Sequence, residues 1–460
     1  MAERTYSIEN TIAALAEAKK YSTLRDILST MNPSDLASVF EELDNPSALP
    51  RLFRLLPKEL AAEAFVEMES ETQELLIQGF SDTELKEVVD ELYVDDAVDL
   101  VEEMPSNVVK RILRQADAET RRLINEMLKY PEDSAGSIMT TEFVSLRPKM
   151  TVEEAEKRIR RTGVDKATIN TCYVTDQGKL IGAISIRTLL LSDHDAVISD
   201  IMEENVISVT TTDDQEDVAQ AFSKYNFSAM PVVDKEGRLV GVVTVDDAMD
   251  VMEEEATEDM EIMAGMSPSE RPYLHTGVVE TWKARITWLL PLMLSAALTG
   301  FVLNHYEGQL SSCLVLSAFI PLLCSTAGNS GTQASVAIIR GLALDELDMS
   351  NLGEVIWKEL RVALLCGVCL AAANFVKMIA VDMALLHNGV TVGVAAAVCL
   401  TLVVVVLFAK LVGCSLPILA GKLGFDPAVI ASPVVSSIVD VLSLLVYFRV
   451  AALLLPELRG

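Results

Sequence analysis

The chain has 460 residues, which is too long for one ordinary domain, and 67 acidic against 37 basic residues give it a formal net charge of −30. Half of its residues are nevertheless hydrophobic, because charge and apolar residues lie in different parts: residues 1–275 hold 56 of the acidic and 27 of the basic groups. This negative charge excludes a nucleic-acid-binding protein, since phosphate recognition requires clustered Lys and Arg.

Residues 1–130 are predicted to form an acidic, all-α N-terminal domain. Apolar residues recur three and four positions apart, as in Leu85, Val88 and Leu92, which is the spacing of one buried helix face. Pieces such as 100–104 recur loosely along this region, and prolines separate the short helices. The repetition predicts helix pairs that stack into a small superhelix.

An internal repeat follows the helical region and predicts two α+β units. The matching segments are 138–146 with 201–209, and 173–182 with 232–241. In each copy an Asp and a Gly form a turn between two β-rich runs, which is a hairpin signal. The tandem copies resemble a CBS-domain pair, with the first repeat at 131–200 and the second at 201–252.

The resemblance to a CBS pair implies a place for an adenine nucleotide, such as ATP, between the two copies. Phe227, Thr244 and Asp246 are the residues expected beside such a ligand. The motif that carries this expectation is loose, so ATP binding stays an open hypothesis.

An acidic stretch follows the second repeat, and residues 253–280 are predicted to form a helix that connects the two halves. Asp247, Asp250, Glu254 and Glu258 are three or four positions apart and line one helix face. Like charges at this spacing destabilise a helix unless a cation screens them. A merely solvated acidic linker is the alternative.

The preceding domains supply further carboxylates that favour a cation site. They are Asp95, Asp96, Asp99, Asp213, Asp214 and Glu216. Carboxylate-rich clusters without His or Cys suit hard cations such as Mg²⁺ or Ca²⁺. The four histidines are scattered along the chain, which argues against a zinc site.

Residues 281–460 are predicted to form an α-helical polytopic membrane domain of five helices, because a bilayer core takes about 20 apolar residues of helix. The candidate spans are Arg285 to Tyr306, Ser311 to Arg340, Trp357 to Leu386, Gly389 to Leu411 and Ala428 to Leu455. The first long apolar segment begins near Ile286, so no N-terminal signal peptide is expected. Six of the seven cysteines lie in these apolar stretches, so no disulfide framework is expected.

Lys and Arg in the short connections predict the orientation of the spans. Lys283 and Arg285 flank the first span, and basic residues recur in the second and fourth links. The links at 304–310 and 387–392 contain none. The N-terminus and the CBS pair are therefore expected in the cytoplasm and the C-terminus outside.

The second span is not a plain hydrophobic helix. Pro321 is followed by residues 325–333, in which Gly, Asn, Ser, Thr and Gln predominate. Lipid cannot satisfy such polar groups, so this stretch predicts irregular backbone that faces protein or a water-filled cavity. A seam of small residues at which helices pack is the alternative.

The fifth span contains Asp440, and no basic residue lies within one helical turn of it. A carboxylate near the centre of a membrane helix costs about 2.5–3.5 kcal/mol. Asp440 is therefore predicted to face a cation path. Lys377 and Lys410 in neighbouring spans are expected to extend along their alkyl stems to an interface and have no assigned role.

These parts, in this order, resemble the MgtE family of magnesium channels or transporters over essentially the whole chain. The most specific motifs are Pro321 followed by Gly328-Asn329-x-Gly331-x-Gln333, and Asp426-Pro427-Ala428 followed by Pro433 and Asp440. The resemblance implies a homodimer in a bacterial inner membrane, with the pore between the subunits.

The resemblance also implies roles for individual residues. Asp440 is expected to hold a hydrated Mg²⁺ ion, with Gly328, Asn329, Gln333 and Ser436 along the ion pathway. Intracellular Mg²⁺ is expected to bridge the N-terminal domain, the CBS pair and the connecting helix and to hold the pore shut. The positions that match the regulatory metal-binding residues are Asp95, Gly136, Asp214, Glu216, Asp247, Asp250, Glu255, Glu258 and Asp259.

The leading hypothesis is a Mg²⁺ transporter gated by intracellular Mg²⁺, which is then both substrate and regulator. One alternative is a pore that also admits Co²⁺, Ni²⁺ or Mn²⁺, and another is a membrane-anchored metal or nucleotide sensor. An enzyme is not expected, because the sequence shows no nucleophile–base constellation. Its Gly-Asn-Ser-Gly run also lacks the strand–turn–helix context of a phosphate-binding loop.

Overall fold

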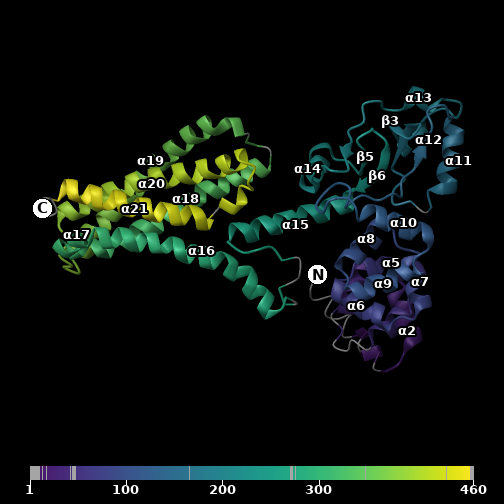
Figure 1. Cartoon of the computed structure of the whole chain (residues 1–460), viewed down its shortest axis with the longest axis horizontal. Helices are drawn as coiled ribbons and strands as arrows, with labels where there is room; N and C mark the ends of the chain where they lie inside the picture. The colour runs from purple at the N-terminus through teal and green to yellow at the C-terminus, as the bar shows by residue number, and fades with distance from the viewer. Residues whose placement is uncertain are drawn as a thin grey trace. The chain divides into compact units, whose positions relative to one another are not determined.

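The structure of the chain is a computed structural model (Figure 1), which describes residues 11–455 except positions 13, 17, 42, 44–47, 165, 270–272, 275, 345, 348 and 431. The chain divides into two compact units, Met1–Met252 and Glu253–Gly460. The first unit contains the helical N-terminal domain and the CBS pair, and the second contains the long apolar helices. The predicted multidomain fold class is confirmed.

The N-terminal domain consists of short helices. They are α2 (Tyr21–Leu28), α3 (Pro33–Glu41), α4 (Leu49–Phe53), α5 (Lys58–Val66), α6 (Ser70–Gly79), α7 (Asp82–Val89), α8 (Val94–Glu103), α9 (Ser106–Gln115) and α10 (Ala118–Met127). Helices α3, α5, α7 and α9 contact one another in succession, so helix pairs stack along the chain as predicted. Phe53, Phe65 and Phe80 are buried at their shared core, and the Phe53 and Phe80 ring centroids are 5.3 Å apart.

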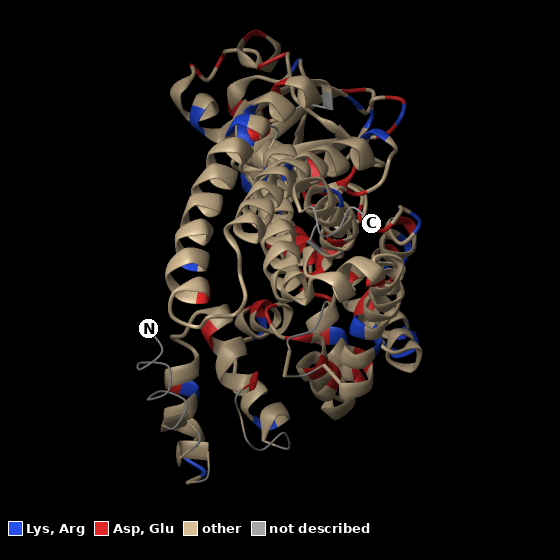
Figure 2. Cartoon of the chain, turned by 90° about the vertical axis from the view of Figure 1, so that its left-hand side faces the viewer, with Lys and Arg blue, Asp and Glu red and all other residues tan. Residues whose placement is uncertain are grey.

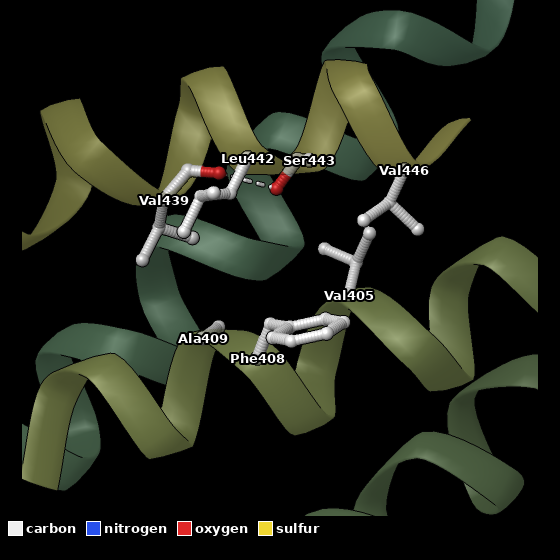
Figure 3. A pocket seen from close by; sticks show the side chains of 7 residues that line it. All are labelled: Val405, Phe408, Ala409, Val439, Leu442, Ser443 and Val446. Carbon is white, nitrogen blue, oxygen red and sulfur yellow. Dashed lines mark hydrogen bonds between the residues drawn. The ribbon is translucent and has the colours of Figure 1, made fainter. Parts of the chain in front are cut away.

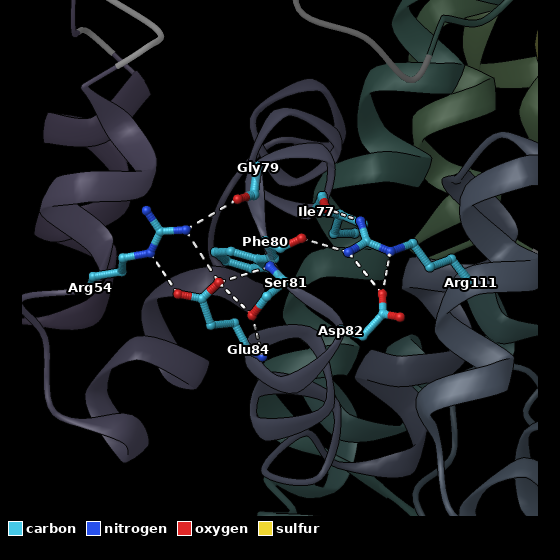
Figure 4. A network of polar contacts seen from close by, with 8 residues as sticks. All are labelled: Arg54, Ile77, Gly79, Phe80, Ser81, Asp82, Glu84 and Arg111. Atoms are coloured by element: carbon cyan, nitrogen blue, oxygen red, sulfur yellow. Dashed lines mark hydrogen bonds and ion pairs between the residues drawn. The ribbon is translucent and has the colours of Figure 1, made fainter.

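Two arginines tie neighbouring helices to the end of α6 (Figure 4). Arg54 Nε donates to Glu84 Oε1 at 2.6 Å, and its Nη2 donates to the Gly79 carbonyl. Glu84 in turn accepts from the backbone N–H of Ser81, which completes a capping box at the start of α7. On the other side, Arg111 of α9 donates to carbonyls of the same turn and to the Asp82 carboxylate.

Replacing Glu84 by Gln is expected to loosen α7 by about 1 kcal/mol at pH 7, because one side chain serves both the cap and the ion pair. The hydrogen bond from Arg54 is the main cause that lowers the pKa of Glu84 to about 2. The ionised Glu84 therefore stabilises the fold above about pH 4.5, and this contribution disappears as the pH falls towards 2. Hydrogen exchange of α7 in the full chain measures the effect.

Glu87→Gln is the matched control, because it removes only an exposed ion pair with Lys58, at 2.9 Å. Equal exchange rates in the Glu84 and Glu87 variants would contradict the role given to the capping box.

The two repeats have the same topology, as predicted. Their strands and helices are β1 (Ser145–Leu146), α11 (Val152–Thr162), β2 (Thr171–Asp176), β3 (Lys179–Ser185), α12 (Ile186–Leu191) and α13 (Ile198–Ile201), then β4 (Val209–Thr210), α14 (Gln215–Tyr225), β5 (Ala229–Val233) and β6 (Leu239–Thr244). In each sheet a short parallel strand precedes an antiparallel hairpin. Gly178 and Gly237 have φ of +86° and +78°, which glycine adopts without strain in the two hairpin turns.

The acidic stretch is helical from the end of the second repeat. The predicted bounds of the connecting helix, 253–280, differ from the structure: β6 leads directly into α15, which runs only from Val245 to Met263. The next helix, α16, begins at Val278.

The second unit is a bundle of long apolar helices with few charges along their lengths (Figure 2). Its elements are α16 (Val278–His305), α17 (Glu307–Ser312), η1 (Leu314–Phe319), α18 (Ile320–Ala343), η2 (Met349–Asn351), α19 (Leu352–Lys377), η3 (Met378–Met383), α20 (Val392–Lys422), η4 (Ala428–Ile430) and α21 (Ser432–Leu454). Within the described residues, five segments are long and apolar enough to cross a membrane, as the sequence predicts. The chain is a multi-pass membrane protein.

Two details of the membrane helices differ from expectation. The prediction of irregular backbone at 325–333 is wrong, because α18 is one continuous α-helix from Ile320 to Ala343. Its polar groups need no break, since a helix satisfies every backbone N–H and C=O internally. Helix α20 continues to Lys422, well beyond the predicted end at Leu411, and includes Pro417.

Lys410 does not extend to an interface as expected. Its side chain is buried and pairs with Glu359 of α19, with Nζ 3.3 Å from Oε2. Burying a charge costs several kcal/mol per ion in lost hydration. An oppositely charged partner offsets this cost, so Lys410 is stabilised by Glu359 without reaching water. Lys377 pairs with Asp382 at 2.8 Å, so neither lysine neutralises Asp440.

Candidate functional site

The helices that carry the polar residues predicted in the membrane, α18 and α21, pack against each other (Figure 1). Asp440 of α21 is half-buried, and its carboxylate lies beside the Cys324 thiol of α18. One turn away, a Cβ added to Gly328 would lie 3.6 Å from Ser436 Oγ. The two helices thus bring Gly328, Ser436 and Asp440 together.

A second polar face of α18 is exposed in the single chain. Ser325, Asn329 and Gln333 are four positions apart, so they share one face of this helix, and all three are exposed. Asn329 and Gln333 therefore lie beside the Asp440 interface and not within it. Amide and hydroxyl groups on the surface of a membrane helix require protein or water opposite them.

Small residues let three helices approach closely next to this polar face. A Cβ added to Gly331 of α18 would lie 2.9 Å from Val435 Cγ1 and 3.2 Å from the carbonyl oxygen of Ala409. Gly413 of α20 faces the Gly331 carbonyl even more closely. The small-residue packing seam, which was the alternative reading of this stretch, is therefore present.

Gly413→Ala is expected to destabilise the membrane domain by about 1–3 kcal/mol, because the new methyl group meets the backbone of Gly331 and not a side chain that can move. Thermal unfolding of the full chain in detergent measures the loss. Gly300→Ala is the control, since nothing lies within 4 Å of the added Cβ on α16. A Gly413 variant as stable as the Gly300 variant would contradict the close contact.

A pocket lined by residues that flank Asp440 in the sequence is not an ion path (Figure 3). It lies between α20 and α21 and is lined by Val405, Phe408, Val439, Leu442 and Val446, with Ala409 and Ser443. The only polar side chain there is that of Ser443, whose hydroxyl donates to the Val439 carbonyl at 2.6 Å. An apolar gap with no room for a water molecule cannot replace the hydration of a cation.

A second group of carboxylates gathers in the first unit, where α8 faces the start of α15. Burial, followed by the neighbouring Asp96 and Asp247 carboxylates, raises the pKa of Asp95 to about 8. The pKa of Asp99 is raised to about 8 by the same causes, and that of Asp96 to about 6. Glu142 adds to the repulsion at Asp95 and Asp96. We call Asp95, Asp96, Asp99, Glu142 and Asp247 the α8 acidic cluster.

Within the part of the chain that the structure describes, no Lys or Arg forms an ion pair with the α8 acidic cluster. Asp95 is buried, and among the described residues its Oδ1 atom has no hydrogen-bond partner. Within the same described part of the chain, no three His, Cys, Asp or Glu side chains are arranged tightly enough to hold a bare metal ion. A cation that keeps its water shell fits such a loose arrangement better than a dehydrated one, and Mg²⁺ dehydrates reluctantly.

Asp247 and Asp214 also accept hydrogen bonds at the starts of helices. Asp247 accepts from the backbone N–H and the hydroxyl of Thr244 at the start of α15. Burial raises the pKa of Asp247, and the carboxylates of Asp246 and Asp250 raise it less. Asp214 caps α14 by accepting from the N–H of Glu216 at 2.9 Å. A capping carboxylate retains oxygen lone pairs for a cation.

Gly136 packs so closely against Tyr130 and Thr211, near Asp214, that a side chain would not fit. Its N–H donates to the Thr211 carbonyl, and an added Cβ would lie 2.6 Å from Cγ of Tyr130 and 2.7 Å from that carbonyl oxygen. The adjacent Ser134 pairs with Asp214 as a β-bridge. The structure therefore brings Gly136 and Asp214 to the same loop pair.

The second half of α15 carries the remaining predicted ligands. Burial, then Asp426 and Glu255, raises the pKa of Asp259. Asp426 lies in the loop before η4, where its carboxylate accepts from the N–H of Ala428 at 2.7 Å. Glu258 is exposed on the same helix. The structure thus groups Asp259, Glu255 and Asp426 within the second unit.

The residues predicted for a nucleotide lie in the second repeat. The ring of Phe227 stacks on that of Tyr225, with centroids 5.4 Å apart. The buried Thr244 hydroxyl is already bonded to Asp247, and Asp246 is exposed.

Sequence reasoning missed three members of these groups. Glu142 lies outside the acidic runs of the sequence, and Asp426 stands out only as part of the Asp-Pro-Ala motif. Cys324 is one of six cysteines in apolar segments. In the sequence, each of these residues is only a polar residue near a Pro or Thr, and such residues are common. The distances between side chains in the structure are needed to identify them.

Comparisons with known proteins agree with this architecture. A family model described as "Divalent cation transporter" (MgtE) matches residues 320–450, the MgtE intracellular N domain matches 31–133, and the CBS domain matches 135–195 and 198–254. The magnesium transporter MgtE of Thermus thermophilus is 37% identical over 94% of this chain and 95% of its own length. The Bacillus subtilis protein of the same name is 30% identical over 97% of each chain.

A solved structure of a magnesium transporter is also similar to about half of this chain. The crystal structure of the soluble part of a magnesium transporter covers 55% of this chain and 99% of that chain, with a TM-score of 0.51 and 32% sequence identity. Because the Thermus relative matches nearly end to end and the family models match in the same order, the chain belongs to the MgtE family of divalent-cation transporters.

Proposed function

We propose that this protein transports Mg²⁺ across a bacterial inner membrane through a pore formed by two copies of the chain. The observation that carries the proposal is Asp440, a half-buried carboxylate in an apolar helix that neither Lys377 nor Lys410 neutralises. A charge at that depth is costly unless it serves a passing cation. Relatives named magnesium transporters, matched over nearly the whole chain, supply the identity of the ion.

The chemistry of the site suits a hydrated dication. Mg²⁺ prefers octahedral oxygen ligands and releases its waters reluctantly. The Asp440 carboxylate supplies negative charge, and the Ser436 hydroxyl, 3.5 Å from that of Thr332, supplies a neighbouring oxygen. Together they hold the ion through its water shell without stripping it.

The pore is proposed to lie between two subunits because of the exposed face of α18. Ser325, Asn329 and Gln333 have no place against lipid. A second copy that presents the same face encloses a polar path between the two α18 helices. In this arrangement the N-terminal and CBS domains are cytoplasmic and the C-terminus is outside.

Intracellular Mg²⁺ is proposed to close the pore by binding the regulatory carboxylates. The α8 acidic cluster supports this step, because burial and mutual repulsion raise the pKa values of its members and leave them short of positive charge. A dication there relieves the repulsion only while the domains stay together. Asp214, Glu216, Gly136 and the α15 residues Asp250, Glu255, Glu258 and Asp259 belong to the same proposal.

An adenine nucleotide between the two CBS repeats completes the proposal. The stacked ring of Phe227 and the exposed carboxylate of Asp246 are the features that support it, with Thr244 between them in sequence.

A flux measurement tests the proposed transport. The purified full chain is reconstituted into liposomes that contain a Mg²⁺-sensitive dye, and Mg²⁺ is added outside. Uptake well above that of protein-free liposomes is expected, and it should fall when Mg²⁺ is also present on the side of the cytoplasmic domains. A folded, reconstituted protein without uptake would refute the proposal.

A broader cation selectivity is the second candidate, and Cys324 favours it. A thiol beside the Asp440 carboxylate is a ligand for softer divalent metals, which Mg²⁺ does not need. Cys324→Ser is expected to weaken competition by Co²⁺ and Ni²⁺ about tenfold, while Mg²⁺ uptake stays near the wild-type level. Competition curves in the same liposomes measure the change. Unchanged competition would remove Cys324 from the selectivity of the pore.

A further inference from the structure

A charged pair at the end of α19 has no part in the proposed transport. Lys377 Nζ lies 2.8 Å from Asp382 Oδ2. Residues five apart on an α-helix point about 140° away from each other. Here the π-helical turn η3 widens the helix, as the hydrogen bond from Ala384 N to Ile379 O at 3.1 Å records. The wider turn places Lys377 and Asp382 on one face, and such turns occur frequently at functional sites.

The two charges are unequally exposed. The Asp382 side chain is 9% exposed, whereas that of Lys377 is 51% exposed. The carboxylate therefore lies inside the protein and the ammonium group lies at its surface. Lys377 Nζ also sits 5.7 Å from the centroid of the Phe319 ring. From outside, this end of the helix presents the ammonium group of the ion pair above an aromatic side chain.

A cavity of about 410 Å³ adjoins the pair. One side is apolar and comes from η1 and the start of α18, with Leu314, Val315, Phe319 and Leu322. The other side carries the Lys377–Asp382 pair and Asn388 from the link between α19 and α20. Cavities of about 300–1,000 Å³ with a few placed polar groups are typical ligand sites. We call this space the α19-end cavity.

We propose that the α19-end cavity binds an anionic membrane phospholipid. The Lys377 ammonium and the Asn388 side-chain amide hold the phosphate, and one acyl chain lies on Leu314, Phe319 and Leu322. The combination selects an amphiphile: a free phosphate ion leaves the apolar side unused, and a plain hydrocarbon leaves the polar side with Lys377 and Asn388 unused. The site lies where a candidate span ends, which is the depth of lipid phosphates.

Lipid retention by the purified full chain tests the proposal. The protein in detergent is incubated with phosphatidylglycerol or with phosphatidylcholine of the same chains, and bound lipid is counted by native mass spectrometry. Phosphatidylglycerol is expected to be retained preferentially. Lys377→Gln should lower this retention about tenfold, because a charge-assisted hydrogen bond to phosphate is lost.

Matched variants separate the site from general effects. Lys358→Gln removes a lysine from the other end of α19 and should retain phosphatidylglycerol as the wild type does. Lys377→Arg keeps the cation and should also retain it. If Lys377→Gln does not fold, Asn388→Ala in the neighbouring link replaces it, with lower retention expected.

Three results would overturn the proposal. The first is equal retention in wild type and Lys377→Gln. The second is displacement of the bound lipid signal by millimolar inorganic phosphate alone, which would make the site an anion site. The third is a change in the mass of the protein assembly caused by Lys377→Gln, which would make this face an interface with a second copy. None of these readouts depends on Mg²⁺ flux, so they stand apart from the proposed transport.

Discussion

Asp440→Asn is expected to reduce Mg²⁺ uptake into liposomes by at least about 100-fold. The substitution keeps the size and the hydrogen-bonding capacity of the side chain but removes its charge. A unit charge 4 Å from a cation contributes about 4 kcal/mol at an effective dielectric constant of 20, and a dication gains more. The carboxylates of Asp382 and Glu359 are already paired with Lys377 and Lys410, so neither replaces the lost charge.

Two control variants keep this prediction specific. Asp440→Glu retains the charge and should keep part of the uptake. Ser443→Ala removes a buried hydroxyl on the same helix that donates only to the Val439 carbonyl, so uptake should stay near the wild-type level. Thermal unfolding in detergent shows whether each variant is folded. A folded Asp440→Asn protein with wild-type uptake would show that Asp440 is not on the ion path.

Without divalent cations, the contact between α8 and the start of α15 is expected to weaken by roughly 5 kcal/mol between pH 5.5 and 7.5, about half of it from each of two buried carboxylates. Burial and neighbouring carboxylates raise the pKa values of Asp95 and Asp99 to about 8. These groups are protonated in the folded protein but ionised in the open one, so the folded state binds more protons. Stability is therefore complete at acid pH and is lost as the pH rises towards 8.

Hydrogen exchange of residues 94–103 in the full chain measures this effect. At pH 7.5, millimolar Mg²⁺ should slow exchange back to the rate seen at pH 5.5, because the ion replaces the protons as the screening charge. Asp95→Asn should remove much of both the pH dependence and the Mg²⁺ effect. In liposomes, a higher internal Mg²⁺ concentration should be needed to close the pore of the Asp95→Asn variant and stop Mg²⁺ uptake.

Asp90→Asn is the matched control for the α8 acidic cluster. Asp90 is a neighbouring carboxylate, but it is exposed and pairs with Lys86 at 2.7 Å. It should leave the exchange of α8 and its response to Mg²⁺ unchanged. If Asp95→Asn responds to pH and Mg²⁺ as this control does, the cluster is not the sensor.

The polar stretch of the second span shows how far sequence reasoning reaches. Its Gly, Ser, Asn and Gln residues are recognisable as unusual for a membrane helix. Whether they break the helix depends on what lies opposite, and the sequence does not contain that information. The close approach of Gly413, Val435 and Ala409 to Gly331 shows that α18 continues because neighbouring helices fit against its small residues.

The partners of the membrane-domain lysines are also not predictable from the sequence. Lys410 and Glu359 are 51 residues apart and meet only because α19 packs on α20. Lys377 and Asp382 are close in sequence, yet an α-helix would have separated them, and the π-helical turn brings them together.

The order of domains, the internal repeat, the five spans and the isolated carboxylate Asp440 are determined by the sequence alone. Each depends on composition or periodicity over a short window, where local physics dominates. The tertiary structure alone decided the pairing of Lys410, the raised pKa values of the α8 acidic cluster and the α19-end cavity. These depend on distances between residues that are remote in the chain or on the exact helical register, and electrostatic and packing energies change steeply over a few ångströms.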